Sequence, residues 1–203
     1  MPYIKYPNNG QGKIFVFSAA SGAGKTTLLN HLKTVYPDLV YSVSATTRKP
    51  RTGEVNGIHY FFMTPEVFIK KRDANEFAEW AMVHGHYYGT PKSFIDATIA
   101  SGRHIIMDID VFGKKKFDAI YPDTTGILLV PPSIEILEKR LRCRNTDSEE
   151  TIMLRLSNAR KEMEFARLEG KYEYTVINDG LEKAMAEVVA IVGAIIKPGV
   201  QQE

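Results

Sequence analysis

Hydrophobic and polar positions follow two patterns that alternate along the chain. Short, nearly continuous apolar runs are typical of buried parallel strands, and apolar residues that recur every three or four positions are typical of helices covering a sheet. The strand-like runs occupy residues 13–17, 40–44, 58–63, 104–110, 126–132 and 174–179. The helical stripes occupy residues 28–36, 94–99, 134–141, 152–166 and 181–195. This alternation predicts an α/β sandwich built on a parallel sheet.

Hydroxyl and carboxylate residues mark where further helices begin. Thr64 followed by Pro65 is a good helix start, because the hydroxyl caps the first turn and proline suits the first helical position. With the aromatic strand before it, this helix indicates a small α/β insert. Ser133 caps another helix, and Asp147 with Glu150 resembles a capping box, so we expect a new helix to begin there.

The apolar run at residues 104–110 ends in two carboxylates, Asp108 and Asp110. A buried parallel strand delivers polar groups in this way at its carboxyl end, where open α/β sheets bind ligands. Strand alternation places both carboxylates on one face, which is costly unless a cation or hydrogen-bond donors meet them. A magnesium-bound nucleotide meets that need, and a capped strand end is the alternative.

A glycine-rich loop at residues 18–27 joins the first strand-like run to the first helical stripe. Gly22 and Gly24 carry no side chain, so the backbone there can coil tightly and aim successive N–H groups at a phosphate. Lys25 adds a positive charge for the outer phosphates, and the Thr26 hydroxyl is a natural Mg²⁺ ligand. The loop therefore predicts a site for a nucleoside triphosphate.

Ala19 stands where the pattern G-x-x-x-x-G-K-[ST] has its first glycine. If that position requires a positive φ, alanine costs about 1 kcal/mol or more, and if it only leaves the strand, alanine serves. The alternative to a phosphate loop is a Gly/Ser-rich turn that happens to precede a lysine-bearing helix. The strand and the helix on either side favour the phosphate loop.

Composition and charge narrow the class of protein. The 203 residues, 44% of them apolar, suffice for one core with small inserted parts. The net charge of +2 is too balanced to predict a nucleic-acid or membrane partner. No apolar run approaches the roughly 20 residues that span a bilayer. The single Cys143 excludes an internal disulfide and is interpreted as an ordinary side chain at a helix end, so we expect a cytoplasmic protein. The pattern leaves the oligomeric state and protein partners open.

Two groups of arginines are candidates for anion binding. Arg48 and Arg51 lie in the irregular segment 46–54, and two guanidinium groups on a loop suit a bidentate grip on phosphate. A solvated basic turn is the alternative. A second group lies near two helix ends and is a candidate to converge on one anion, although such arginines alone are more often surface residues; it consists of Arg140, Arg144 and Arg155.

The chain resembles a guanylate kinase over nearly its whole length, from Lys13 to about Ile196. The matching segments are SGAGKTTL, SVSATTRKPRTGEVNGIHYFF, FAEWAMVHGHYYGT, MDIDVFG, RLRCRNTDSEETI and VIND. The resemblance implies an α/β fold, a P-loop NTPase-type three-layer sandwich with a parallel core sheet, a small α/β GMP-binding insert and a helical lid. The implied core covers about residues 13–40, 91–139 and 158–197, the insert 41–90 and the lid 140–157.

The implied reaction is phosphoryl transfer from ATP to GMP with Mg²⁺, and the resemblance assigns roles to residues. The ATP-binding residues are Ala19, Ala20, Ser21, Gly22, Ala23, Gly24, Lys25, Thr26, Thr27 and, near the adenine, Asn178. The resemblance implies that the GMP phosphate binds to Arg48, Arg51, Tyr60 and Tyr88. It implies that the guanine binds to Ser44, Glu79, Thr90 and Asp110. The catalytic residues are Lys25, Arg140, Arg144 and Arg155. The implied Mg²⁺ ligand is Thr26, and Asp108 is implied to contact the ion through water.

The chain also departs from the family pattern. Cys143 and Asn145 stand where the family usually has glycines around the lid arginine, and Ala45 replaces a commonly polar residue. Two other functions fit parts of the sequence: a non-catalytic guanylate kinase-like binding module, and a related kinase acting on another monophosphate or a phosphorylated sugar. The intact phosphate loop argues against the first, and Glu79 with Thr90 favours guanine over other bases.

Overall fold

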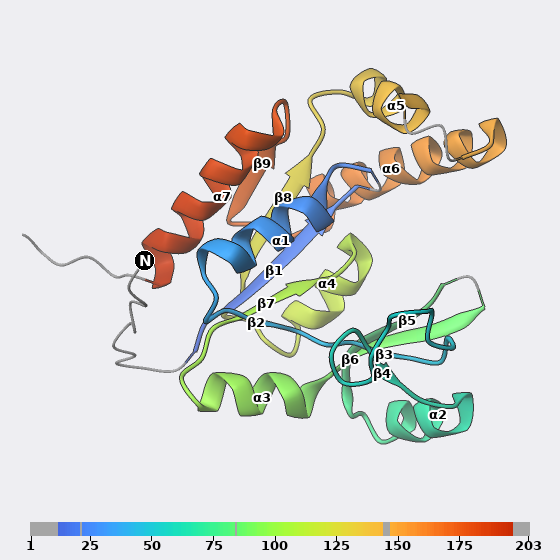
Figure 1. The fold of residues 1–203 in the computed structure, drawn as a ribbon, viewed down its shortest axis with the longest axis vertical. Coiled ribbons are helices and arrows are strands. Elements are labelled where there is room, and N and C mark those ends of the chain that lie inside the picture. Colours follow the sequence, from blue (N-terminus) through green and yellow to red (C-terminus); the bar gives the residue numbers. More distant parts are fainter. Residues whose placement is uncertain (1–11, 21, 84, 144–146, 197–203) are drawn as a thin grey trace, which may run out of the picture.

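The computed structural model describes residues 12–20, 22–83, 85–143 and 147–196. Its core is a sheet of five strands in which every neighbouring pair is parallel (Figure 1). In spatial order the strands are β2 (Val40–Tyr41), β7 (Ile105–Asp108), β1 (Ile14–Ala19), β8 (Thr125–Val130) and β9 (Tyr174–Ile177). The predicted α/β fold with a parallel core sheet is therefore confirmed.

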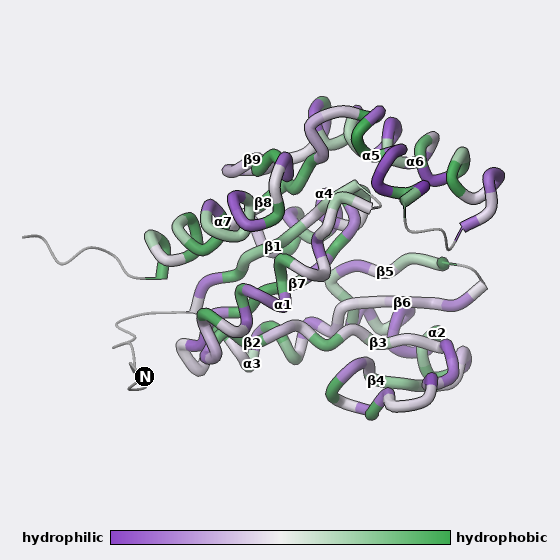
Figure 2. The backbone as a smooth tube through the Cα atoms, turned by 45° about the horizontal axis from the view of Figure 1, so that its top comes forward, coloured by the Kyte–Doolittle hydropathy of each residue, from purple (hydrophilic) through white to green (hydrophobic). Residues whose placement is uncertain are grey.

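Strand β1 lies in the middle of this sheet and is buried along its whole length. Phe15 and Phe17 pack into one core cluster, and Ile14 and Val16 pack into another on the opposite face. The first face is covered by α1 (Lys25–Val35) and α7 (Leu181–Ile196), and the second by α3 (Lys92–Ala100) and α4 (Val111–Asp118). Figure 2 shows that hydrophobic residues follow one another along β1, β7 and β8, between these helices.

A second, smaller sheet stands beside the core and forms what we call the insert, residues 45–91 (Figure 1). Its strands, in spatial order, are β4 (Phe61–Phe62), β3 (Ala45–Thr46), β6 (His86–Pro91) and β5 (Phe77–Val83). Helix α2 (Pro65–Asp73) closes it, and the fully buried Phe68 ring stacks on Phe77 at 4.4 Å and on Tyr87 at 5.2 Å. The insert thus has an aromatic core of its own.

Two helices, α5 (Ile134–Cys143) and α6 (Glu149–Glu169), form the remaining part of the fold. They pack together through Leu137, Leu141, Ile152 and Leu156, and this cluster also contains Ala20 beyond the end of β1. The α5–α6 pair therefore rests directly on the segment that follows the central strand. No helix within the described ranges is both long and apolar enough to cross a membrane.

The structure differs from the sequence-based expectation at three local points. The single extended run at residues 40–44 is divided, because β2 joins the core sheet and the chain then enters the insert sheet at β3. The cap of α6 is Ser148, whose hydroxyl accepts from the Thr151 N–H at 3.3 Å, so the expected Asp147–Glu150 capping box is wrong. Asp147 instead pairs with Arg155.

The third difference is at the end of β7, which stops at Asp108. Asp110 is already the N-cap of α4, and its carboxylate accepts from the Gly113 N–H at 2.7 Å. Strand alternation does not extend across this boundary, so the expected pair of carboxylates on one strand face does not form. Each carboxylate has a partner of its own, since Asp108 contacts the ammonium group of Lys25.

Helix α4 carries a buried cation. The Lys114 side chain is 2% exposed, and its Nζ lies 2.6 Å from Asp118 Oδ2 and 4.9 Å from the Tyr172 ring centroid. The other oxygen of Asp118 accepts from the Thr124 hydroxyl at 2.9 Å. A buried charge of this kind is tolerated only while its partner remains in place.

Removal of that partner should destabilise the protein strongly. We expect Asp118→Ala to lower the free energy of unfolding by about 3 kcal/mol or more, because it leaves the Lys114 ammonium buried and unpaired. The matched control is Glu169→Ala, which breaks the exposed pair with Lys115 and should cost about 1 kcal/mol or less. Urea unfolding of both variants measures the difference, and equal losses would contradict the assignment.

Candidate functional site

The glycine-rich loop joins the carboxyl end of β1 to the start of α1, as predicted. Gly22 and Gly24 have positive φ angles of 93° and 96°, and Gly24 is the N-cap of α1. Ala19 is the last residue of β1 and has strand geometry. The missing glycine of the pattern therefore imposes no positive φ on an alanine, and the strain considered above does not arise.

Helix α5 packs against this loop at Gly22. A Cβ atom built on Gly22 would lie 3.0 Å from Leu141 Cδ2 and 3.1 Å from Leu137 Cδ1. Glycine is required at this position both by the backbone angle and by the closeness of the two leucines. The buried leucines that stabilise the α5–α6 pair thus also position the loop.

Lys25 and Asp108 meet where β1 and β7 end side by side. The two strands are parallel neighbours, with Phe17 opposite Asp108. Lys25 Nζ and Asp108 Oδ1 are in contact, and the two side chains are 19% and 32% exposed. Asp108 and Thr26 also line one pocket of about 230 Å³. The pair therefore lies at the edge of the sheet where ligands of α/β proteins bind.

The donor atoms at this edge suit magnesium. Thr26 and Asp108 offer a hydroxyl and a carboxylate oxygen, which are the ligands that Mg²⁺ prefers. Within the described residues, no three histidine, cysteine or carboxylate side chains come together as a metal-binding group. The donor set fits an ion that is held by one or two protein oxygens and completes its shell with phosphate and water.

Arg48 is held in the insert by a carboxylate that the sequence analysis missed. Its Nη1 and Nη2 atoms donate to the two oxygens of Glu54 at 2.9 and 2.8 Å, and Nη1 also donates to the Lys49 carbonyl at 2.8 Å. The Arg51 N–H donates to Glu54 at 2.7 Å. Arg48 lowers the pKa of Glu54 to about 2, so this carboxylate is charged at neutral pH.

Aromatic rings surround the Arg48 guanidinium. Its central carbon lies 5.4 Å from the Tyr60 ring centroid and 5.8 Å from that of Phe62. The Tyr60 and Tyr88 rings meet edge to face at 5.9 Å. The structure thus brings three of the four predicted phosphate ligands together, while the fourth, Arg51, is exposed. Because Tyr60 and Glu54 line the same pocket as Thr26 and Asp108, this cluster faces the glycine-rich loop.

A second cluster is formed by Glu79 and Thr90 of the insert together with Asp110, the N-cap of α4. The Thr90 hydroxyl donates to Glu79 Oε1 at 2.5 Å, between neighbouring strands β5 and β6. A Cβ on Gly113 would lie 3.3 Å from Glu79 Oε2 and 3.4 Å from Asp110 Oδ1, so this glycine leaves room for both carboxylates. Burial, with a smaller contribution from Asp110, raises the pKa of Glu79 to about 6, although the Thr90 hydrogen bond opposes the rise.

Asn178 connects the far end of β9 to the loop. Its side chain is 4% exposed, and its Nδ2 donates to the Ala23 carbonyl at 2.7 Å. Its Oδ1 has no hydrogen-bond partner among the described residues. Asn178, Gly24 and Arg140 line a second pocket, of about 360 Å³. The predicted ATP-binding asparagine is therefore placed beside the predicted phosphate loop.

The arginines of the α5–α6 pair are in different places. Arg140 lines the pocket beside Asn178, whereas Arg155 Nη1 lies 3.1 Å from Asp147 Oδ2. Arg142, which the sequence analysis did not single out, donates to Glu138 at 2.8 Å and also pairs with Glu149, so it links α5 to α6. Arg144 and Ser21 lie outside the described residues, as does Asn145.

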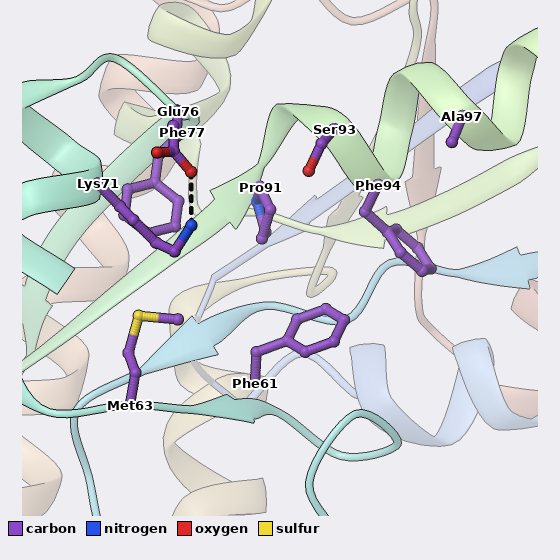
Figure 3. Close-up of a pocket in the computed structure, with 9 residues that line it drawn as sticks. All are labelled: Phe61, Met63, Lys71, Glu76, Phe77, Pro91, Ser93, Phe94 and Ala97. Carbon is purple, nitrogen blue, oxygen red and sulfur yellow. Dashed lines mark hydrogen bonds and ion pairs between the residues drawn. The ribbon is translucent and has the colours of Figure 1, made fainter. Parts of the chain in front are cut away.

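A pocket of about 410 Å³ lies apart from all these groups, at the junction of the insert and α3 (Figure 3). Its walls are mostly apolar, and its rim carries an ion pair between Lys71 and Glu76 at 2.6 Å. The residues that line it are Phe61, Met63, Lys71, Glu76, Phe77, Pro91, Ser93, Phe94 and Ala97. No predicted site residue lies among them.

Comparisons with known proteins agree with one another. The family model described as guanylate kinase matches residues 11–194. A guanylate kinase from Nitratidesulfovibrio vulgaris is 47% identical over 88% of this chain and 85% of its own, and one from Anaeromyxobacter dehalogenans is 48% identical over 89% and 80%. The crystal structure of guanylate kinase from Anaplasma phagocytophilum is similar with a TM-score of 0.68 at 29% identity, covering 92% of this chain and 87% of that one. The chain belongs to the guanylate kinase family.

Proposed function

We propose that this protein transfers the γ-phosphoryl group of ATP to GMP, giving ADP and GDP. The observation that carries the proposal is the pocket that Thr26 and Asp108 of the core share with Tyr60 and Glu54 of the insert. It connects a loop suited to a triphosphate with an arginine cluster suited to a monophosphate. Donor and acceptor phosphates bound at these two places would face each other.

On the donor side, the loop residues 19–27 present backbone N–H groups at the start of α1, where the helix dipole also favours an anion. Lys25 adds a positive charge that Asp108 holds in place until phosphate takes it over. Asn178, which lines a pocket with Gly24, would lie near the adenine. Thr26, with Asp108 through water, would hold Mg²⁺, which when bound helps to neutralise the charge of the transferring phosphoryl group.

On the acceptor side, the GMP phosphate would bind to Arg48, Arg51, Tyr60 and Tyr88. Arg48 has five N–H donors, of which Glu54 and the Lys49 carbonyl occupy those on one edge of the guanidinium. The opposite edge, with Nε and the second Nη2 hydrogen, would meet the phosphate together with Tyr88, which also interacts with this guanidinium. Glu54 is therefore a positioning residue that fixes which edge of Arg48 faces the phosphate.

The guanine would be read by Ser44, Glu79, Thr90 and Asp110. Guanine presents N1–H and N2–H donors side by side, and a single carboxylate, that of Glu79, accepts both. Adenine has an unprotonated N1 at this place, so its lone pair would face the carboxylate and a buried acceptor would stay unpaired, at a cost of about 1–3 kcal/mol.

The transfer itself needs positioning and charge neutralisation rather than a covalent nucleophile. We assign these roles to Lys25, Arg140, Arg144 and Arg155. For Arg155 this requires that the guanidinium leaves Asp147 and turns to the phosphoryl group. The proposed parts are a core at about 13–40, 91–139 and 158–197, a GMP-binding insert at 41–90 and a lid at 140–157. We also propose a cytoplasmic location, which the single cysteine supports.

The proposed function is tested by ADP release with ATP and each of GMP, AMP, CMP and UMP. We expect GMP-dependent turnover, with kcat/KM lower by about 100-fold or more for the other monophosphates, because a site built to pair guanine donors leaves groups unpaired with them. Lys25→Met is the matched control and should lose turnover while keeping GMP binding. Absence of turnover would favour a binding module, and equal rates with AMP a broader kinase.

The raised pKa of Glu79 predicts a pH dependence of GMP use. Below a pH of about 6 this carboxyl becomes protonated and can no longer accept both guanine N–H groups, so Glu79 alone should lower kcat/KM for GMP by about tenfold per pH unit, in addition to any fall caused by the phosphate. The GMP phosphate also titrates at a pH of about 6. Glu79→Gln provides the control, because its profile retains only the phosphate ionisation. Identical profiles of the two proteins would contradict the role of Glu79.

The positioning role of Glu54 predicts a change in KM rather than in kcat. In Glu54→Gln the amide offers one acceptor where the carboxylate offers two, so Arg48 is released and KM for GMP should rise about tenfold. We expect kcat to change by about twofold or less, because the donor site is untouched. Glu66→Gln, at an exposed position of the same insert, should leave both constants unchanged. An unchanged KM in Glu54→Gln would refute the assignment.

A further inference from the structure

Cys143 is the last residue of α5 and the only cysteine in the chain. It is exposed, and it lines the pocket of about 360 Å³ together with Gly24, Arg140 and Asn178. Helical spacing explains this placement, since residues three apart lie on the same face and Cys143 follows Arg140 by three positions. The thiol therefore opens into the proposed donor-nucleotide pocket.

The packing of α5 keeps the thiol there. Leu137 and Leu141 are fully buried and lie against the position of a Gly22 Cβ. These contacts fix the rotation of α5 about its own axis, and with it the side of the helix on which Arg140 and Cys143 line the pocket. The pocket position of Cys143 thus follows from the hydrophobic contacts of its own helix.

An independent observation shows that this pocket is built for a ligand. The Asn178 amide is 4% exposed, and its Nδ2 is fixed by the Ala23 carbonyl. Its Oδ1 has no partner among the described residues, although a buried acceptor without a hydrogen bond costs about 1–3 kcal/mol. Asn178 therefore brings an unsatisfied acceptor to the wall of the pocket.

We propose that Cys143 is a thiol-modification site at which a low-molecular-weight disulfide forms a mixed disulfide that excludes the donor nucleotide. That the excluded nucleotide is ATP or ADP rests on the proposed function. A pocket of this size lies at the lower end of the range of about 300–1,000 Å³ that accommodates one small ligand. A peptide-sized adduct on Cys143 and a nucleotide therefore compete for the same space.

The chemistry needs no reagent besides the disulfide. The Cys143 thiolate attacks one sulfur of the disulfide, a new S–S bond forms, and the old S–S bond breaks. The other half leaves as a thiolate, which takes up a proton from water. The exchange runs backwards when a thiol reductant attacks the mixed disulfide, so the modification is reversible.

The effect should be confined to the donor side. Arg48 and Glu79, which we assign to GMP, lie on the insert, and neither lines the described pocket that Cys143 lines. An adduct on α5 therefore blocks one substrate and leaves the other site open. This separation distinguishes a pocket-specific effect from general damage to the protein.

The test treats the full chain with oxidised glutathione and follows the adduct by intact mass. Calorimetry then measures ADP and GMP binding before treatment, after it and after dithiothreitol. We expect the adduct to raise the Kd for ADP by about tenfold or more and that for GMP by about twofold or less, with recovery on reduction. Bound ADP should slow adduct formation. Cys143→Ser, which keeps the size of the side chain, should bind both nucleotides normally and ignore the reagent.

Three results would overturn the proposal. An adduct that leaves ADP affinity unchanged would show that the thiol is outside the binding space. Loss of both nucleotides would show a global effect, and absence of an adduct where free cysteine reacts would show that the thiol is not accessible. Turnover of the untreated protein with ATP and GMP is measured in parallel. A block of ADP binding without any such turnover would support the modification site while refuting the proposed function.

Discussion

The parallel pairing of β1 with its neighbours is the constraint on which the proposed site depends. Because parallel strands end at the same edge, β1 delivers the glycine-rich loop next to the end of β7, and Lys25 meets Asp108 without any long-range adjustment. The same edge receives Asn178 from the end of β9 through β8. Full burial of β1 on both faces fixes this edge in place. Among the described residues, the positions of the groups assigned to ATP therefore depend on one buried strand, β1.

The insert carries the charged groups that we assign to GMP binding. These charges must be stabilised by the protein itself while GMP is absent. Arg48 is neutralised by Glu54, which lies on the same loop and leaves one edge of the guanidinium available. Glu79 forms no ion pair within the described residues, and its burial raises its pKa to about 6. In the proposed acceptor site, the phosphate end is thus balanced internally, whereas the base end would be completed by the donors of guanine.

Local sequence signals predicted most of the fold, because they act within a few residues. The phosphate loop, the Thr64 cap and the Ser133 cap all form as expected. Features that depend on distant neighbours were out of reach. The run at 40–44 looks continuous although it serves two sheets, and the cap of α6 moved to Ser148 because Asp147 pairs with Arg155. Of the predicted site residues, Arg48, Tyr60 and Tyr88 form one cluster, and Glu79, Thr90 and Asp110 form another. Glu54 was not predicted, because only its proximity to Arg48 along the chain indicates that the two side chains pair.

The pocket at the junction of the insert and α3 bears on how the insert is attached to the core. Protein interiors are usually packed as densely as organic crystals, so a pocket of about 410 Å³ marks a place where the insert and α3 do not pack closely. The Phe68 cluster belongs wholly to the insert, whereas Ala78 of β5 packs into the core cluster of Ile14 and Val16. Across the junction, Phe61 and Phe94 meet only ring edge to ring at 6.1 Å (Figure 3). The insert is therefore anchored to the core through Ala78 of β5, while beside α3 the two parts are separated by this pocket.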